Sequence, residues 1–140
     1  MRGREFFDTN IILYAKIDDS SQKHIIAKNL LENRILHGSP CISIQVVNEF
    51  AVNALRKGRK LSDVETIVEQ LFEVFDIANL NKKSVTDALS ISSRYQFSFW
   101  DSLIVAAALE ERCSVLYTED LQSGQIVDNV LEIKNPFKVS

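Results

Sequence analysis

Short apolar segments alternate with segments of helical periodicity along this chain, and that alternation limits its fold more than any other feature. Strands separated by helices normally pair in parallel through right-handed crossovers. We therefore predict an α/β fold of three layers, α/β/α, around a central parallel sheet of four to five short strands. The expected strands are residues 6–8, 41–44, 77–80, 114–118 and 130–133, and the expected helices begin near residues 11, 24, 45, 61, 84 and 99.

The size of the chain fits one folding unit. Its 140 residues suffice for a single compact domain but not for two ordinary ones. Hydrophobic residues make up 46%, and four glycines and two prolines are too few for a disordered or collagen-like chain. We expect residues 1–140 to form a single domain.

Membrane and secreted classes are disfavoured. The longest nearly apolar stretch, residues 97–109, contains Asp101 and is shorter than the roughly 20 residues that span a bilayer. No long apolar run precedes Glu5, so a secretory signal is not expected, and we predict a cytoplasmic protein without membrane contact. Cys41 and Cys113 each begin an apolar segment without a C-x-x-C spacing, which favours buried thiols.

Acidic residues follow the expected strands at the positions where open parallel sheets carry functional sites. Such sites form beyond the carboxyl ends of the strands. Asp8 ends the first strand, Glu49 lies in the first turns of the helix after the second, and Asp120 follows strand 114–118. Asp101 lies on the helix that leads into that strand. These four acids are the candidate site.

Asp101 is the most informative of these acids. Nine of the eleven residues from 99 to 109 are apolar and they cover every side of the helix, so the helix is expected to be buried. An ionised carboxylate there costs several kcal/mol unless it is paired or bound to a metal. Helix capping is the alternative, because Ser98 three residues earlier suits an N-cap.

The other three acids also have ordinary explanations. Glu49 lies beside the apolar arc of its helix, as expected at the edge of a pocket, but exposed glutamates are common. Asp8 and Asp120 each suit a turn or a cap. None of these explanations predicts that the four side chains converge.

Convergence would require cations. Two carboxylates about 4 Å apart repel by roughly 4 kcal/mol at an effective dielectric of 20. Oxygen-only ligands favour Mg²⁺ or Mn²⁺, which also bind phosphate oxygens. Metal-assisted hydrolysis of a phosphodiester bond, leaving 5′-phosphate ends, follows from this chemistry.

Four ordered motifs give the chain a family resemblance. They are FFDTNIILY at residues 6–14, SIQVVNEF at 43–50, FSFWDSLIVAAA at 97–108 and LYTEDLQSGQ at 116–125. Across about residues 6–137 the chain resembles a PIN domain, specifically the VapC-type toxin ribonucleases of bacterial toxin–antitoxin pairs. No acid of the cluster is replaced, which argues against an inactive copy.

The resemblance implies a Mg²⁺-dependent endoribonuclease. Asp8 and Asp101 would be direct metal ligands, Glu49 a ligand or a base that positions water, and Asp120 a ligand acting partly through water. Asn10 and Thr118 would support the acids by hydrogen bonds. Glu119 would be peripheral to the site.

The resemblance also implies protein partners. It predicts a homodimer and a cognate antitoxin whose Arg- or Lys-bearing tail enters the acidic groove, with DNA contacted only through the antitoxin. Substrate RNA would be steered by a basic cluster after the Glu49 helix, although a solvated helix end explains the same charges. The cluster consists of Arg56, Lys57, Arg59 and Lys60.

Three other classes of function compete with this interpretation. A histidine-driven ribonuclease is disfavoured because the two histidines, His24 and His37, lie on or near a surface helix. A receiver-type Mg²⁺-binding signalling domain would need adjacent acids after the first strand, where this chain has Asp8, Thr9 and Asn10. A nonenzymatic PIN-like interaction module remains open, although the loss of an acid would have favoured it.

Overall fold

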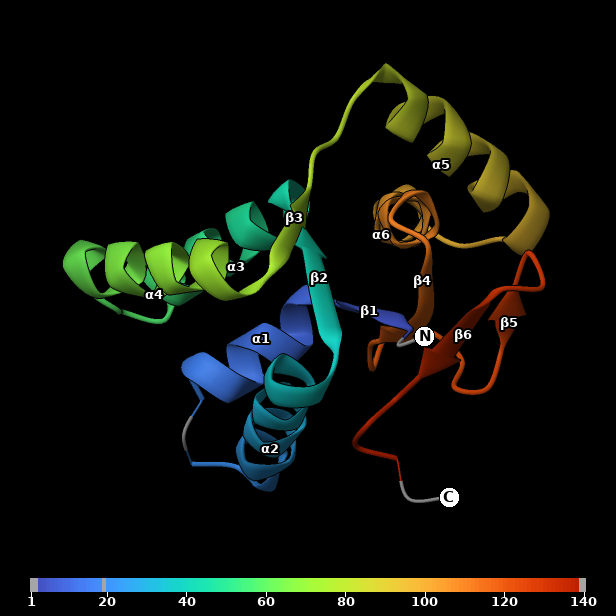
Figure 1. Cartoon of the computed structure of the whole chain (residues 1–140). Coiled ribbons are helices and arrows are strands. Elements are labelled where there is room, and N and C mark those ends of the chain that lie inside the picture. Colours follow the sequence, from blue (N-terminus) through green and yellow to red (C-terminus); the bar gives the residue numbers. More distant parts are fainter. Residues whose placement is uncertain (1–2, 19, 139–140) are drawn as a thin grey trace.

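The computed structural model describes residues 3–18 and 20–138 and places a six-stranded sheet at the centre of the fold (Figure 1). The strand order is β3-β2-β1-β4-β6-β5. The strands are β1 (Arg4–Phe7), β2 (Ser39–Ser43), β3 (Asp76–Ala78), β4 (Cys113–Tyr117), β5 (Ile126–Val127) and β6 (Leu131–Lys134).

Five of these strands are parallel, which confirms the predicted parallel sheet. β1 pairs with β2 on one side and β4 on the other, and β5 alone runs antiparallel, beside β6. The expected four to five strands become six because β5 was not anticipated. Its two residues are too few to show an alternating pattern, and they lie between Gly124 at φ +93° and Asp128 at φ +51°.

Helices flank the sheet, as the predicted three-layer α/β/α class requires. Figure 1 shows α5 and α6 on one side and α1 and α2 on the other, while α3 packs against both α1 and β2. The helices are α1 (Thr9–Lys16), α2 (Gln22–His37), α3 (Ile44–Arg56), α4 (Leu61–Val74), α5 (Lys82–Tyr95) and α6 (Phe99–Glu110).

Most of the helices begin at side chains that can accept a backbone hydrogen bond. Ser21, Ser43 and Ser98 cap α2, α3 and α6 in this way. α4 is the exception, because its N-cap, Lys60, makes no side-chain capping bond.

The core contains α6, the helix that was expected to be buried. Every residue of α6 from Ser102 to Ala108 is buried. Strand β4 is only partly buried, because Ser114 is exposed while Leu116 is fully buried. Both cysteines are free and buried, as predicted. No helix in the described residues has the length and apolar character needed to cross a membrane.

Candidate metal centre

Three of the four predicted acids meet at the carboxyl edge of the sheet. One carboxylate oxygen each from Asp8, Asp101 and Asp120 lies within 4.8 Å of the others. The topology explains this, because β1 and β4 are adjacent and parallel, with Phe7 opposite Tyr117, so the residues after both strands leave the sheet at the same place. The first turn of α6 brings Asp101 to the same point.

Asp8 is the buried member of this acid cluster, with a residue exposure of only 7%. Its Oδ1 accepts the backbone N–H of Thr9 at 2.7 Å, and its Oδ2 accepts the hydroxyl of Thr118 at 2.8 Å. Burial raises the pKa of Asp8 to about 7; the two hydrogen bonds oppose that rise, and the neighbouring Asp120 and Asp101 add to it. Asp8 is also the N-cap of α1, so this residue both caps a helix and belongs to the acid cluster.

Asp120 is the exposed member. Its Oδ2 accepts Asn10 Nδ2 at 3.0 Å, and its backbone N–H donates to Thr118 Oγ1 at 3.1 Å. Partial burial and then the charge of Asp101 raise the pKa of Asp120, and the hydrogen bond from Asn10 opposes them. Asn10 and Thr118 thus contact the acids that the family resemblance assigned to them.

Asp101 serves two purposes. Its backbone N–H donates to Ser98 Oγ at 3.1 Å, so the predicted N-cap is present. Its carboxylate points into the acid cluster, which capping alone does not explain.

Glu49 lines the same hollow but is not part of the 4.8 Å cluster. Its Oε1 accepts Gln45 Nε2 at 2.9 Å, one turn earlier on α3. The same Gln45 amide lies 3.4 Å from the backbone oxygen of Trp100, so it bridges α3 and α6. The predicted position at the edge of a pocket is therefore observed, whereas a position beside the other three acids is not.

The hollow has a volume of about 190 Å³. Three of its lining residues carry a buried side-chain oxygen without a hydrogen-bond partner: Thr9 Oγ1, Asn10 Oδ1 and Gln45 Oε1. A hydrated divalent cation fits this arrangement, since carboxylates bind the ion and unpartnered oxygens accept hydrogen bonds from its water molecules. The lining residues are Asp8, Thr9, Asn10, Leu13, Gln45, Glu49, Asn53, Trp100, Asp101, Ile104 and Asp120.

The predicted basic cluster does not reach this hollow. None of its four residues (Arg56, Lys57, Arg59 and Lys60) is part of the lining, and Arg59 Nη2 instead donates to the backbone oxygen of Ile17 at 2.6 Å. Gly58, at φ +90°, directly follows Lys57, the C-cap of α3. The two histidines are also absent from the lining, and His24 Nδ1 is paired with the backbone oxygen of Tyr14 at 2.9 Å.

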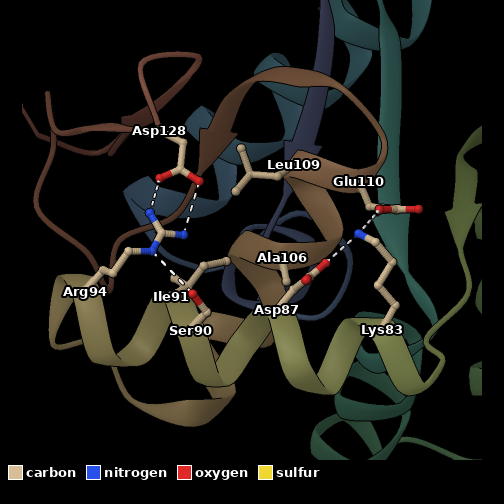
Figure 2. Close-up of a pocket in the computed structure, with 9 residues that line it drawn as sticks. All are labelled: Lys83, Asp87, Ser90, Ile91, Arg94, Ala106, Leu109, Glu110 and Asp128. Atoms are coloured by element: carbon tan, nitrogen blue, oxygen red, sulfur yellow. Dashed lines mark hydrogen bonds and ion pairs between the residues drawn. The ribbon is translucent and has the colours of Figure 1, made fainter.

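A second hollow, between α5 and α6, is a poor candidate for binding anionic ligands (Figure 2). Its volume is about 270 Å³, but its two cations already contact acids. Lys83 lies 2.7 Å from Asp87 and 3.2 Å from Glu110, and Arg94 pairs with Asp128. These contacts leave no free cation for an anionic ligand.

Sequence reasoning missed Gln45 and Trp100 as residues of the hollow. Gln45 is buried, although it is polar and stands between Ile44 and Val46 at the carboxyl end of β2. That position beyond a strand end is the same signal that found the acids. Trp100 directly precedes Asp101, but its apolar character assigned it to the core, whereas the structure leaves it 65% exposed.

Comparison with known proteins identifies the family. A model of the PIN domain matches residues 6–126, and the chain belongs to this family. No curated protein matches the chain significantly. The family assignment removes the receiver-type alternative.

Solved structures share the fold at low sequence identity. A toxin–antitoxin complex from Klebsiella pneumoniae is 20% identical, with a TM-score of 0.70 over 96% of this chain and 99% of that chain. VapC20 of Mycobacterium tuberculosis, named as a toxin that cleaves the sarcin–ricin loop, is 17% identical, with a TM-score of 0.69 over 83% and 91%. VapBC2 of Rickettsia felis, bound to a DNA fragment from its promoter, is 19% identical, with a TM-score of 0.69 over 94% and 99%.

Proposed function

We propose that this chain is a Mg²⁺- or Mn²⁺-dependent endoribonuclease that acts as the toxin of a toxin–antitoxin pair. The observation that carries the proposal is the convergence of Asp8, Asp101 and Asp120, whose carboxylate oxygens lie within 4.8 Å of one another. Three like charges so close together are stable only when a cation or protons offset their repulsion. Membership of the PIN family and a structural relative named as a sarcin–ricin loop cleaving toxin support RNA as the substrate class.

Asp8, Asp101 and Asp120 would hold the metal. A bound divalent cation supplies charge that offsets the carboxylates, favours hydroxide over water and stabilises the departing 3′ oxygen. The chain's own residues prepare the site: Thr118 and Thr9 fix both oxygens of Asp8. Preformed ligands lose little freedom when the ion binds.

Glu49 would act on the attacking water and would not bind the metal together with the other three acids. Its carboxylate faces the hollow outside the acid cluster and is oriented by Gln45. A carboxylate in this position can accept a proton from the attacking water, which is the role of a general base. Gln45 would keep one Glu49 oxygen in place while the other takes the proton.

Protein partners belong to the same proposal. A cognate antitoxin would neutralise the acid cluster with Arg or Lys, and DNA would be contacted only through that antitoxin; two of the structural relatives are a toxin–antitoxin complex and a VapBC2 bound to promoter DNA. We further propose that residues 1–140 act as one domain, as a homodimer and in the cytoplasm. RNA contact by Arg56, Lys57, Arg59 and Lys60 would be distant steering, since they lie outside the hollow.

The test is cleavage of single-stranded RNA by chelator-treated protein, free of antitoxin, before and after addition of Mg²⁺ or Mn²⁺. We expect cleavage only with the metal, with 5′-phosphate ends on the products. Asp101→Asn should abolish it. Asp63→Asn is the matched control, because Asp63 is an exposed acid on α4 outside the hollow.

Equal cleavage in excess EDTA would reject the metal-dependent mechanism. No cleavage with either metal, by a protein that still binds a partner, would favour the nonenzymatic interaction module instead.

A further inference from the structure

Trp100 is the most exposed aromatic side chain among the large hydrophobic residues of the described structure, and it stands at the rim of the acidic hollow. Its residue exposure is 65%, compared with 47% for Phe72 on α4. It also contributes to the lining of the hollow, together with its neighbour Asp101. An indole next to a catalytic cluster and open to solvent needs an explanation beyond core packing.

The protein holds this residue in place without covering it. Ser98 caps the first turn of α6, and Gln45 Nε2 lies 3.4 Å from the Trp100 backbone oxygen. The ring meets Phe99 edge to face, with centroids 5.6 Å apart and an interplanar angle of 71°. An edge-to-face contact with one neighbour is compatible with an open face of the indole.

The hollow itself is too small for a nucleotide. Its volume is about 190 Å³, below the roughly 300 Å³ at which pockets for drug-sized ligands begin. A cation and a phosphate group would occupy most of it. The bases of a bound strand must therefore lie outside, along the rim where Trp100 stands.

The charge of the hollow also favours contacts with the bases at the rim. Its lining contains Asp8, Glu49, Asp101 and Asp120 but no Lys or Arg. The whole chain has a net charge of −3. Phosphate contacts to cations, which normally dominate affinity for nucleic acid, are absent from this lining, so contacts with neutral parts of the strand become more important.

We propose that Trp100 is a stacking platform for an unpaired RNA base next to the phosphate bound at the acid cluster. The inference rests on the proposed function for the identity of the substrate. Stacking between a base and an aromatic ring does not read base edges, so it selects single-stranded or looped RNA rather than a particular letter. The protein would thereby distinguish unpaired strands from duplexes, whose bases are already stacked.

The experiment uses the fact that Trp100 is the only tryptophan of the chain. Its fluorescence is followed in the Glu49→Gln protein with Mg²⁺, where we expect metal binding with strongly slowed cleavage. A single-stranded RNA of about 12 nucleotides is added first, and then the same strand annealed to its complement. RNA binding is measured independently by anisotropy of a labelled strand. We expect the single strand to quench Trp100 and the duplex to leave it unchanged.

Variants separate stacking from mere apolar contact. Trp100→Leu should weaken binding of the single strand by roughly 5- to 100-fold, whereas Trp100→Phe should stay close to wild type because it keeps an aromatic face. Phe72→Leu, the matched control at a second exposed aromatic, should bind like wild type.

Several results would overturn the inference. They are no binding of the single strand, no quenching at saturation, equal quenching by the duplex, or unchanged binding by Trp100→Leu. A change of oligomeric state in Trp100→Leu with unaltered RNA binding would show a contact with a second copy of the chain instead. Metal-dependent cleavage is measured separately. Cleavage that does not depend on Trp100 rejects only the stacking inference. Quenching by the single strand without any cleavage by the wild type rejects only the proposed nuclease function.

Discussion

The hydroxyl of Thr118 joins two members of the acid cluster, since it donates to Asp8 Oδ2 at 2.8 Å and accepts the backbone N–H of Asp120 at 3.1 Å. Thr118 is completely buried and directly follows β4, and Asp8 directly follows the neighbouring β1. One hydroxyl group therefore fixes both the orientation of the buried carboxylate and the start of the loop that carries the exposed one.

Thr118→Val should weaken this arrangement while keeping the shape of the side chain. Removal of the hydroxyl leaves buried polar groups without a partner, which costs about 1–3 kcal/mol of unfolding free energy. Loss of a hydrogen bond to a metal ligand should also reduce Mg²⁺ affinity by roughly 10- to 100-fold. Denaturant unfolding and Mg²⁺ titration measure the two effects. Thr66→Val, on the exposed face of α4, is the control and should change neither by much.

The pKa of Asp8 predicts how stability depends on pH in the absence of metal. Its folded pKa of about 7 lies above the ordinary value of 3.8, so between these values the folded chain keeps a proton that the unfolded chain has lost. The free energy of unfolding should therefore fall as the pH rises from about 4 to 7.

Asp8→Asn should remove this part of the pH dependence. In EDTA the variant should be more stable than wild type at pH 8, and the difference should shrink towards pH 4. Unfolding curves across this range test the sign, with Asp63→Asn as the control. The prediction would be contradicted if the free energy of unfolding of the wild type rose from pH 4 to 7 relative to that of Asp8→Asn. That result would show that ionisation of the buried carboxyl group does not destabilise the fold.

Glu49→Gln should separate metal binding from catalysis. Glu49 lies outside the 4.8 Å cluster, so the variant should keep Mg²⁺ affinity within a few-fold of wild type. Cleavage should fall by roughly 10²- to 10⁴-fold, as for the loss of a general base. Single-turnover cleavage at saturating metal gives this value. A loss of affinity as large as that of Asp101→Asn would instead make Glu49 a ligand.

The ion pair of Arg94 with Asp128 should contribute only to structure. It links α5 to the turn between β5 and β6 (Figure 2). Tyr95 supports the pair, because its hydroxyl donates to Asp128 Oδ1 at 2.7 Å. Because the pair is partly exposed, Arg94→Met should lower the free energy of unfolding by only about 1 kcal/mol or less. RNA cleavage should be unchanged, and a large loss of activity would show that the second hollow takes part in function.

The sequence predicted the sheet and the edge that carries the site because both depend on simple periodicity. Short apolar runs between helices define a parallel sheet, and residues such as Asp8 and Asp120 that directly follow its strands meet at one edge. The two-residue β5 escaped prediction, since Ile126 and Val127 are too short to show alternation and are placed by pairing with β6.

The positions of individual side chains were harder to predict from the sequence than the order of the strands and helices. The sequence grouped Glu49 with the other three acids and placed it at the edge of a pocket. Glu49 does line the hollow, bonded to Gln45, but it lies outside the 4.8 Å cluster. The basic cluster follows the Glu49 helix in sequence, but none of its residues lines the hollow, and Arg59 instead donates to the backbone oxygen of Ile17. Trp100 looked like a core residue because composition cannot tell which face of a nearly uniform apolar helix is open.

Binding of Mn²⁺ to chelator-treated protein, followed by electron paramagnetic resonance, tests the acid cluster most directly. We expect saturable binding by the wild type and by Asp63→Asn, competition by Mg²⁺, and loss of binding in Asp8→Asn and Asp101→Asn. Undiminished binding in both cluster variants, or no binding by the wild type, would contradict the account.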